Sequence, residues 1–430
     1  MLDLRMLREE TDRVRQGLAA RHAAFDLDRV LALDAERRDL IFHTEAMKKR
    51  RNEASRDIGR LKQAGQETET LQTEIRGIGD QIKANDERLR AIEDGIQRLL
   101  LLIPNTPHSS APVGRDERDN VLVRTWGEPP QLDFPPKPHW ELGEALGLLD
   151  LPRAAKLAGS GFVVFRGAGA RLERALIAFM LDLHVREHGF TEIHPPFLAS
   201  RQTMTGTGQL PKMEEDMYRI DAEDLFLIPT AEVQLVNLFR DEMLVGLDLP
   251  LRVAGHTACF RREAGSYGKD VRGLIRVHQF DKVEMVSLTT PETSYDELER
   301  LLGFAETVLR RLGFHYRVIE LCTGDFAFQA AKCYDIEVWA PGVGRYLEVS
   351  SVSNCEDFQA RRANIRFKRD ERAKPEFVHT LNGSGVALPR CLIALLESCQ
   401  EADGSIVVPE ALRPYMGAER IAQPDAQVKA

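Results

Sequence analysis

Apolar residues recur at alternating steps of three and four along two stretches near the start of the chain. In the first stretch, residues 30–61, most positions of this repeat are apolar. After a break that contains Gly65, the spacing resumes over residues 71–99, where Asn85 is the one polar position. Such a repeat is typical of the seam of a coiled coil. It predicts an antiparallel helical hairpin over about residues 27–100, with each helix about 50 Å long.

Proline-rich segments interrupt the chain after the hairpin, at residues 103–107, 127–130 and 134–138. Because proline breaks helices, we place a boundary between an N-terminal domain, residues 1–105, and a second domain, residues 106–430. The second domain contains an amphipathic helix over residues 171–188. Short strands are expected at residues 162–165, 225–228, 282–285 and 335–339. Helices and strands do not alternate regularly, which predicts an α+β fold on a mainly antiparallel sheet.

Composition indicates the general class of protein. With 430 residues, of which 43% are hydrophobic and 29% charged, the chain is expected to be soluble and globular with more than one folding unit. No apolar run approaches the roughly 18 residues of a membrane span, and the first residues lack the layout of a secretion signal. The six cysteines include no CxxC pair, so we expect neither disulfides nor zinc. We therefore expect a cytoplasmic protein without membrane contact.

Charge is distributed unevenly along the chain. The formal net charge of −9 argues against a surface that is basic throughout, yet residues 47–62 carry five more basic than acidic side chains. Two interpretations stay open from this pattern: a solvated helix surface with local ion pairs, or an arm that contacts phosphates of a nucleic acid. The candidate nucleic-acid contacts are Lys48, Lys49, Arg50, Arg51, Arg56 and Arg60.

A dense group of charged residues lies in the second domain, although the chain has no P-loop and no GxGxxG turn. Residues 260–265 read Phe-Arg-Arg-Glu-Ala-Gly, and a strand-like segment follows at residues 272–284. Guanidinium groups suit phosphate and carboxylate oxygens, a carboxylate can accept a hydrogen bond from an adenine amino group, and an aromatic ring such as Phe280 can stack on a base. An exposed charged hairpin is the alternative.

Two further segments carry candidate nucleotide chemistry. Glu348 and Ser351 lie on a strand-like segment and offer the hard oxygen ligands that Mg²⁺ shares with substrate phosphates. Hydrogen bonding at a strand end is the alternative for this pair. Residues 382–397 run from a turn into a helix, with Pro389 in its first turn. Arg390 then lies at the positive end of that helix, where an anion is stabilised.

Taken in order, these segments resemble the bacterial-type seryl-tRNA synthetase family of class II aminoacyl-tRNA synthetases. Segments similar to the three class II motifs lie at residues 171–196, 260–280 and 382–397, and shorter similar segments lie at residues 230–232, 323–325, 348–351 and 357–364. The resemblance covers nearly the whole chain. It implies an N-terminal tRNA-binding domain with a coiled-coil arm and a class II catalytic domain. The implied reaction activates L-serine with ATP to seryl-adenylate and transfers the seryl group to the 3′-terminal adenosine of tRNA(Ser).

The resemblance also implies roles for individual residues. Residues implied in catalysis are Arg261, Arg390 and Glu348. Residues implied in serine binding are Thr230, Ala231, Glu232, Arg261, Glu284, Asn382 and Ser384. Residues implied in ATP binding are Arg261, Arg262, Glu263, Val277, Phe280, Glu348, Val349, Ser350, Ser351 and Arg390. Mg²⁺ would be held by Glu348 and Ser351.

The family further implies a homodimer, formed around the first motif, and leaves open whether tRNA(Sec) is a second substrate. Two alternatives remain: a homologue that charges a carrier protein, and a coiled-coil scaffold without catalysis. Carrier-charging relatives lack a long arm, whereas residues 27–100 predict one here. With the family in view, the basic segment favours a tRNA-binding arm. This chain has Arg262 where family members often have serine.

Overall fold

The computed structural model describes residues 1–264 and 272–422, so Gly265 of the predicted 260–265 motif lies outside the described residues. The chain divides into two compact units. The smaller unit consists of Leu2–Ala19 and Ala23–Pro104. The larger unit consists of Met1, Ala20–His22 and Asn105–Ala430.

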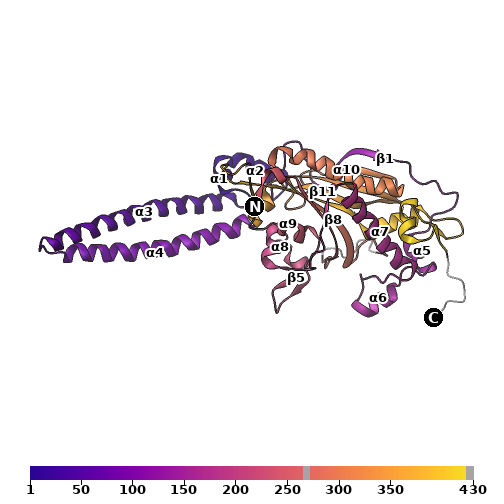
Figure 1. The fold of residues 1–430 in the computed structure, drawn as a ribbon, viewed down its shortest axis with the longest axis horizontal. Coiled ribbons are helices and arrows are strands. Elements are labelled where there is room, and N and C mark those ends of the chain that lie inside the picture. Colours follow the sequence, from indigo (N-terminus) through magenta and orange to yellow (C-terminus); the bar gives the residue numbers. More distant parts are fainter. Residues whose placement is uncertain (265–271, 423–430) are drawn as a thin grey trace. The chain divides into compact units, whose positions relative to one another are not determined.

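The smaller unit is built around a long helical hairpin. Its helices are α1 (Leu4–Glu9), α2 (Thr11–Ala20), α3 (Leu27–Gln63) and α4 (Glu69–Leu100). Figure 1 shows α3 and α4 lying side by side along their length. The Asp26 side chain accepts a hydrogen bond from the Arg29 amide and so caps the start of α3. Gly65 adopts a φ of +68° in the turn between the helices, a conformation that favours glycine. The predicted antiparallel hairpin is confirmed.

Two buried or partly buried polar contacts occur in the smaller unit, one across the seam of the hairpin and one near its base. Asn85 donates a hydrogen bond from Nδ2 to Oγ1 of Thr44 across the seam at 3.0 Å. Nearer the base, the fully buried carboxylate of Asp34 accepts from Arg8 at 3.1 Å and pairs with Arg37 at 3.2 Å. The Asn85–Thr44 pair joins α4 to α3 and is satisfied in only one alignment of the two helices, so it helps to fix their register. Asp34, by contrast, links α3 to α1.

The larger unit contains an eight-stranded sheet in the order β1-β9-β10-β11-β14-β8-β7-β2. The strands in that order are Val121–Trp126, Tyr316–Glu320, Lys332–Ala340, Arg345–Asn354, His379–Ala387, Gln279–Thr289, Leu251–Phe260 and Thr191–Glu192. In this sheet, as residues 1–264 and 272–422 form it, β2 pairs with β7 in parallel and the other neighbouring strands are antiparallel. The structure confirms the predicted α+β fold on a mainly antiparallel sheet.

Three helices pack against this sheet: α7 (Ala168–Arg186), α10 (Ser294–Leu312) and α12 (Leu388–Ser398). Their apolar residues share one core with the strands, including the fully buried Leu176, Leu301 and Val283. This core supports the strands that carry the polar residues discussed below. The shorter helices are α5 (His139–Ala145), α6 (Leu151–Ala158), α8 (Arg201–Thr207), α9 (Glu232–Asn237), α11 (Phe358–Ala363) and α13 (Arg413–Met416).

Smaller sheets complete the larger unit. Their strands are β3 (Leu198–Ser200), β4 (Arg219–Ile220), β5 (Leu225–Leu227), β6 (Met243–Val245), β12 (Arg366–Lys368), β13 (Glu376–Phe377), β15 (Ile406–Val407) and β16 (Arg420–Ile421). The expected strand at 162–165 is wrong, because only Phe165 forms an isolated bridge, with Leu149. Gly159 and Gly161 have φ values of +94° and +81°, which turn the backbone out of an extended path there. Within residues 1–264 and 272–422, no helix is both long and apolar enough to cross a membrane.

Candidate active site

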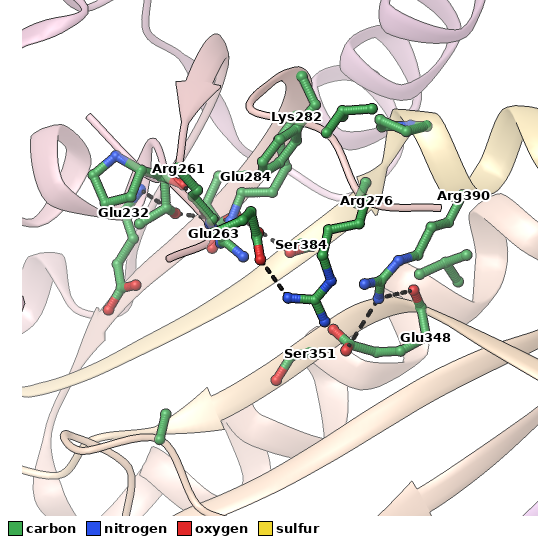
Figure 2. A pocket seen from close by; sticks show the side chains of 18 of the residues that line it. Glu232, Arg261, Glu263, Arg276, Lys282, Glu284, Glu348, Ser351, Ser384 and Arg390 are labelled. Carbon is green, nitrogen blue, oxygen red and sulfur yellow. Dashed lines mark hydrogen bonds and ion pairs between the residues drawn. The ribbon is translucent and has the colours of Figure 1, made fainter. Parts of the chain in front are cut away.

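Strands β8, β11 and β14, the start of α12 and the segment that follows β7 line a cavity of about 450 Å³ in the larger unit (Figure 2). This volume lies in the usual range for small-molecule sites. Most residues implied in serine and ATP binding line this cavity, namely Thr230, Glu232, Arg261, Glu263, Val277, Phe280, Glu284, Glu348, Val349, Ser351, Asn382, Ser384 and Arg390. Residues that are far apart in sequence therefore meet in one place.

Two arginines enter the cavity from different elements. Arg261 follows the last residue of β7, and its guanidinium carbon lies 5.2 Å from the centroid of the Phe280 ring. Arg390 lies in the first turn of α12, where Pro389 precedes it. Its Nη1 donates to the backbone carbonyl of Glu348 at 2.8 Å and to the Glu348 carboxylate at 3.2 Å. The two guanidinium groups can thus contact different parts of one polyanion.

A third arginine, Arg276, lines the same cavity and forms an ion pair with Glu263. Figure 2 shows the two side chains pointing toward each other. Glu263 has a φ of +53°, a left-handed conformation that is uncommon for a residue other than glycine. The sequence motifs assigned no role to Arg276. Its position four residues before Phe280, in the same charged segment, could have marked it as a candidate for nucleotide binding.

Lys282 is another residue without a role in the sequence analysis, and it lies among the residues implied in serine binding. Its Nζ donates to Oγ1 of Thr230 at 2.8 Å and forms an ion pair with Glu284. Both partners on β8 are buried, with 6% of Lys282 and none of Glu284 exposed. Asn382 and Ser384 lie at 3.3 Å and 3.5 Å from the Glu284 carboxylate, the limit of a hydrogen bond. The lysine is therefore the main partner of this carboxylate.

Glu232 is the second buried carboxylate on this side of the cavity. The amide of Gln359 donates to its Oε1 at 2.6 Å, and Gln359 in turn accepts from Thr380 at 2.7 Å. Burial, together with the negative charge of Glu284, raises the pKa of Glu232 to about 7. Two carboxylates thus share a buried volume with one lysine, a combination that suits a ligand ammonium group.

Glu348 and Ser351 lie on β11 and both line the cavity. The pairing of β10 with β11 shifts register at Glu348, which is a β-bulge that offsets the alternation of side chains. A carboxylate and a hydroxyl then face the same space, as the donor chemistry of Mg²⁺ requires. Asp335 lies opposite Ser351 on the neighbouring strand β10. Its burial, and to a lesser extent the negative charge of Glu348, raise the pKa of Asp335 well above the ordinary value. In the described part of the chain, no three His, Cys, Asp or Glu side chains converge as a metal site.

Three residues implied in substrate binding do not line the cavity with their side chains. Ala231 is fully buried and immediately precedes Glu232, the first residue of α9. Ser350 is buried and donates to the backbone carbonyl of Ser384 at 2.6 Å. Arg262 does not line the cavity and donates to the backbone carbonyl of Glu215 at 3.0 Å. Ala231 and Ser350 therefore position neighbouring residues, and the unusual Arg262 fixes the segment around Glu215.

The candidate tRNA contacts all lie on α3 and differ in their partners. Lys48 pairs with Glu45 and with Asp86 of α4 at 3.2 Å and 3.8 Å. Arg50 pairs with Glu74 of α4 at 2.9 Å, and Arg60 pairs with Asp57 at 3.3 Å. Among the described residues, no ion pair is formed by the remaining three, Lys49, Arg51 and Arg56. The six residues thus fall into two groups.

Comparison with known proteins covers both units. Residues 1–107 match the model for the seryl-tRNA synthetase N-terminal domain, and residues 214–399 match the tRNA synthetase class II core domain (G, H, P, S and T). The chain is 57% identical over 417 residues to the serine–tRNA ligase of Geobacter sulfurreducens, covering 97% of this chain and 99% of that protein. Two solved structures resemble it closely over 99% of its length.

One is seryl-tRNA synthetase from Pyrococcus horikoshii complexed with ATP, which is 38% identical with a TM-score of 0.94 and is covered over 100% of its length. The other is cytoplasmic serine–tRNA ligase from Naegleria fowleri in complex with AMP, which is 28% identical with a TM-score of 0.89 and is covered over 99% of its length. The chain therefore belongs to the seryl-tRNA synthetase family of class II aminoacyl-tRNA synthetases, which confirms the family that its motifs predicted.

Proposed function

We propose that the cavity of the larger unit is the active site of a serine–tRNA ligase, in which L-serine reacts with ATP and the seryl group then passes to tRNA. One observation carries the proposal: arginines, a carboxylate and hydroxyl pair, and two buried carboxylates converge in one cavity. ATP supplies phosphates for the arginines. The ammonium and hydroxyl groups of serine suit the two buried carboxylates. Family membership supports the same overall reaction.

In the first step, an oxygen of the serine carboxylate attacks the α-phosphorus of ATP. The new P–O bond replaces the bond to the β-phosphate, and pyrophosphate leaves. Arg261, beside Phe280, holds the α-phosphate and the serine carboxylate together, while Arg390 takes charge from the outer phosphates. This role is positioning and charge stabilisation, so no covalent enzyme nucleophile is needed.

In the second step, a ribose hydroxyl at the 3′ end of tRNA attacks the seryl carbonyl. The bond to the phosphate breaks, AMP leaves, and the hydroxyl proton passes to a phosphate oxygen. The serine side chain is held throughout by Glu284, Ser384 and Thr230, with Glu232 facing the ammonium. Alanine lacks the hydroxyl that Glu284 accepts, and a buried acceptor left unpaired disfavours its binding.

Glu348 and Ser351 are the residues that would hold Mg²⁺, and their oxygen atoms fit the ion. When bound, the ion neutralises charge that develops on the phosphates. Arg390 pairs with Glu348 in the cavity, so nucleotide phosphates that attract Arg390 would also leave this carboxylate available to Mg²⁺.

The smaller unit supplies the tRNA-binding arm in this proposal, with residues 1–105 as one domain and residues 106–430 as the catalytic domain. We further propose a homodimer that includes the short edge strand β2, action in the cytoplasm, and tRNA(Ser) as the substrate. Basic side chains on α3 support the arm assignment, because phosphate contacts dominate RNA affinity. Charging of tRNA(Sec) is measured in the same assay as charging of tRNA(Ser).

The experiment that tests the proposal is ATP–pyrophosphate exchange with each of the twenty amino acids, followed by charging of tRNA(Ser), tRNA(Sec) and a carrier protein. We expect exchange with serine only and charging of tRNA(Ser). Exchange with serine but transfer only to a carrier protein would support the carrier-charging alternative. No exchange with any amino acid would support a scaffold and refute the active-site assignment. The R390A variant should lose exchange, while R118A, at a surface ion pair outside the cavity, should retain it.

A further inference from the structure

A row of three residues on α3 faces away from the seam of the hairpin. Phe42, Lys49 and Arg56 are spaced seven residues apart and all three are exposed. The seam side of the same helix is marked by the buried Thr44 and Ala54. A spacing of seven residues places side chains on one line along a helix, at intervals of about 10 Å. We call these three residues the outer row of α3.

Phe42 is the unusual member of the outer row, because 73% of it is exposed. Its ring meets that of the neighbouring His43 edge to face, with 5.6 Å between ring centroids. A solvent-facing position of a coiled coil is ordinarily polar, since an exposed aromatic ring gains nothing from folding. An exposed ring beside cations is instead typical of a surface that stacks on nucleotides.

The cations of the outer row differ from the two cations that flank Lys49 in whether they form ion pairs. Within residues 1–264 and 272–422, neither Lys49 nor Arg56 forms an ion pair. Lys48 and Arg50, which flank Lys49, are both tied to carboxylates of α4. A cation without a protein partner contacts a phosphate without first breaking an ion pair. The outer row therefore carries the more available positive charge of this segment.

The opposite face of the hairpin has the reverse charge. On α4, the residues at the equivalent outward positions are Asp80, Glu87 and Asp94, and all three are exposed. Such a row repels a phosphate backbone. A second basic row on α4, Arg76, Lys83 and Arg90, lies beside these acids and has no aromatic member. Charge and aromatic character together favour the outer row of α3 over both rows of α4.

We propose that the outer row of α3 is the surface of the arm that contacts tRNA, with Phe42 stacking on a nucleotide and Lys49 and Arg56 binding phosphates. This inference rests on the proposed tRNA-binding function of the arm and specifies which face performs it. Phe42 requires an unstacked base, so the segment it meets is a loop, bulge or strand end of the RNA. Lys48 and Arg50, by contrast, hold the two helices of the hairpin together.

The test uses the full-length protein and purified tRNA(Ser), with the dissociation constant measured by filter binding as a function of KCl concentration. Each lost phosphate contact lowers the slope of log affinity against log salt by about 0.7 to 0.9. The K49M/R56M variant should therefore lower this slope by about 1.4 to 1.8. The matched control K48M/R50M removes the same charge from adjacent positions and should leave the slope nearly unchanged.

Phe42 is tested by F42A and F42Y in the same assay. Loss of one stacked nucleotide should raise the dissociation constant by about 5- to 150-fold without changing the salt slope, and F42Y should restore binding. Serine-dependent pyrophosphate exchange should be unchanged in every variant, which also shows that the larger unit remains folded. Unfolding of the hairpin is monitored by circular dichroism, so loss of binding through unfolding is recognised.

Three results would overturn the proposal. They are an unchanged salt slope in K49M/R56M, a larger change in K48M/R50M or in R76M/K83M, and wild-type affinity in F42A. If deletion of residues 47–83 also left tRNA charging intact, the arm itself would have no role. If the wild type failed to exchange pyrophosphate with serine, the active-site assignment would fail instead. The two failures are therefore distinguishable.

Discussion

Lys282 offers the sharpest test of the serine subsite, because its only partners in the described structure are substrate-facing residues. Replacing it with methionine keeps the length of the side chain and removes the charge. Glu284 then loses its ion-pair partner and retains only the long contacts from Asn382 and Ser384. Thr230 loses the hydrogen bond that it accepts from Lys282 at 2.8 Å. The change thus affects one buried carboxylate and one hydroxyl.

The size of the effect follows from the burial of the pair. Glu284 is fully buried, and removing one partner of a buried ion pair costs about 3–5 kcal/mol when the other charge stays ionised. We expect kcat/KM for serine to fall by about 10²- to 10³-fold at pH 8, which corresponds to about 3–4 kcal/mol.

The assay is serine-dependent pyrophosphate exchange at saturating ATP, measured from pH 6 to 9. K282M should also have a lower Tm than the wild type, because the buried Glu284 has lost its ion-pair partner. K282R, which retains the charge, should restore much of the activity.

The matched control is K332M, because Lys332 forms an ion pair with Glu320 at 3.1 Å on the same sheet but does not line the cavity. It should lower Tm without changing KM for serine. The reasoning is refuted if K282M activates serine as well as the wild type does. A loss in K282M that K332M reproduces in kcat/KM would also refute it, since the effect would then reflect general destabilisation.

Three further outcomes are expected. The pKa of Glu232, about 7, is higher than the value of 4.5 for an ordinary carboxyl. Protonation of Glu232 therefore stabilises the folded protein at low pH, and this stabilisation is lost as the pH rises to about 7. Because serine needs the ionised form, kcat/KM for serine should rise from pH 6 to pH 8, and E232Q should abolish the rise; a rise unchanged in E232Q contradicts the assignment. R276A should raise KM for ATP about 10- to 100-fold while leaving KM for serine nearly unchanged, and equal effects on both substrates would exclude a nucleotide role. R124A, which removes a two-point contact with the buried Glu306 at 2.7 Å and 3.0 Å, should lower Tm by about 2–6 °C with unchanged pyrophosphate exchange, as calorimetry and the exchange assay would show.

The helical hairpin and the sheet class follow from the sequence because both are set by local periodicity. The repeat over residues 30–61 and 71–99 is visible without tertiary information, and the break at Gly65 marks the turn. The residues of the cavity were named from motifs that resemble a family, and most of them line one cavity. The strand expected at 162–165 failed because its apolar residues are followed and preceded by glycines that turn the chain.

Lys282 and Gln359 escaped the sequence analysis for a different reason. Each acts through a partner that is distant along the chain: Lys282 through Thr230, and Gln359 through Glu232. A buried lysine on a strand has no periodic signal, because its burial depends on which carboxylate the fold brings beside it. Likewise, the difference between Lys48 and Lys49 on α3 depends on the facing residues of α4 and not on the local sequence. Pairing across elements is therefore the part of this site that local patterns did not contain.

Three cationic side chains in the cavity form ion pairs with three carboxylates, and this pairing can couple the binding of one substrate to that of another. Arg276 holds Glu263, Arg390 holds Glu348, and Lys282 holds Glu284. Each pair joins a cation suited to an anionic substrate group with a carboxylate suited to a cation or a donor. Such pairing avoids the cost of isolated charges in a poorly solvated space. In the proposed reaction, the phosphates of ATP would compete for the two arginines, and each arginine that they recruit would free a carboxylate: Glu263 for the base, or Glu348 for Mg²⁺. We therefore expect nucleotide binding to favour binding of the metal ion through this exchange of partners within the cavity.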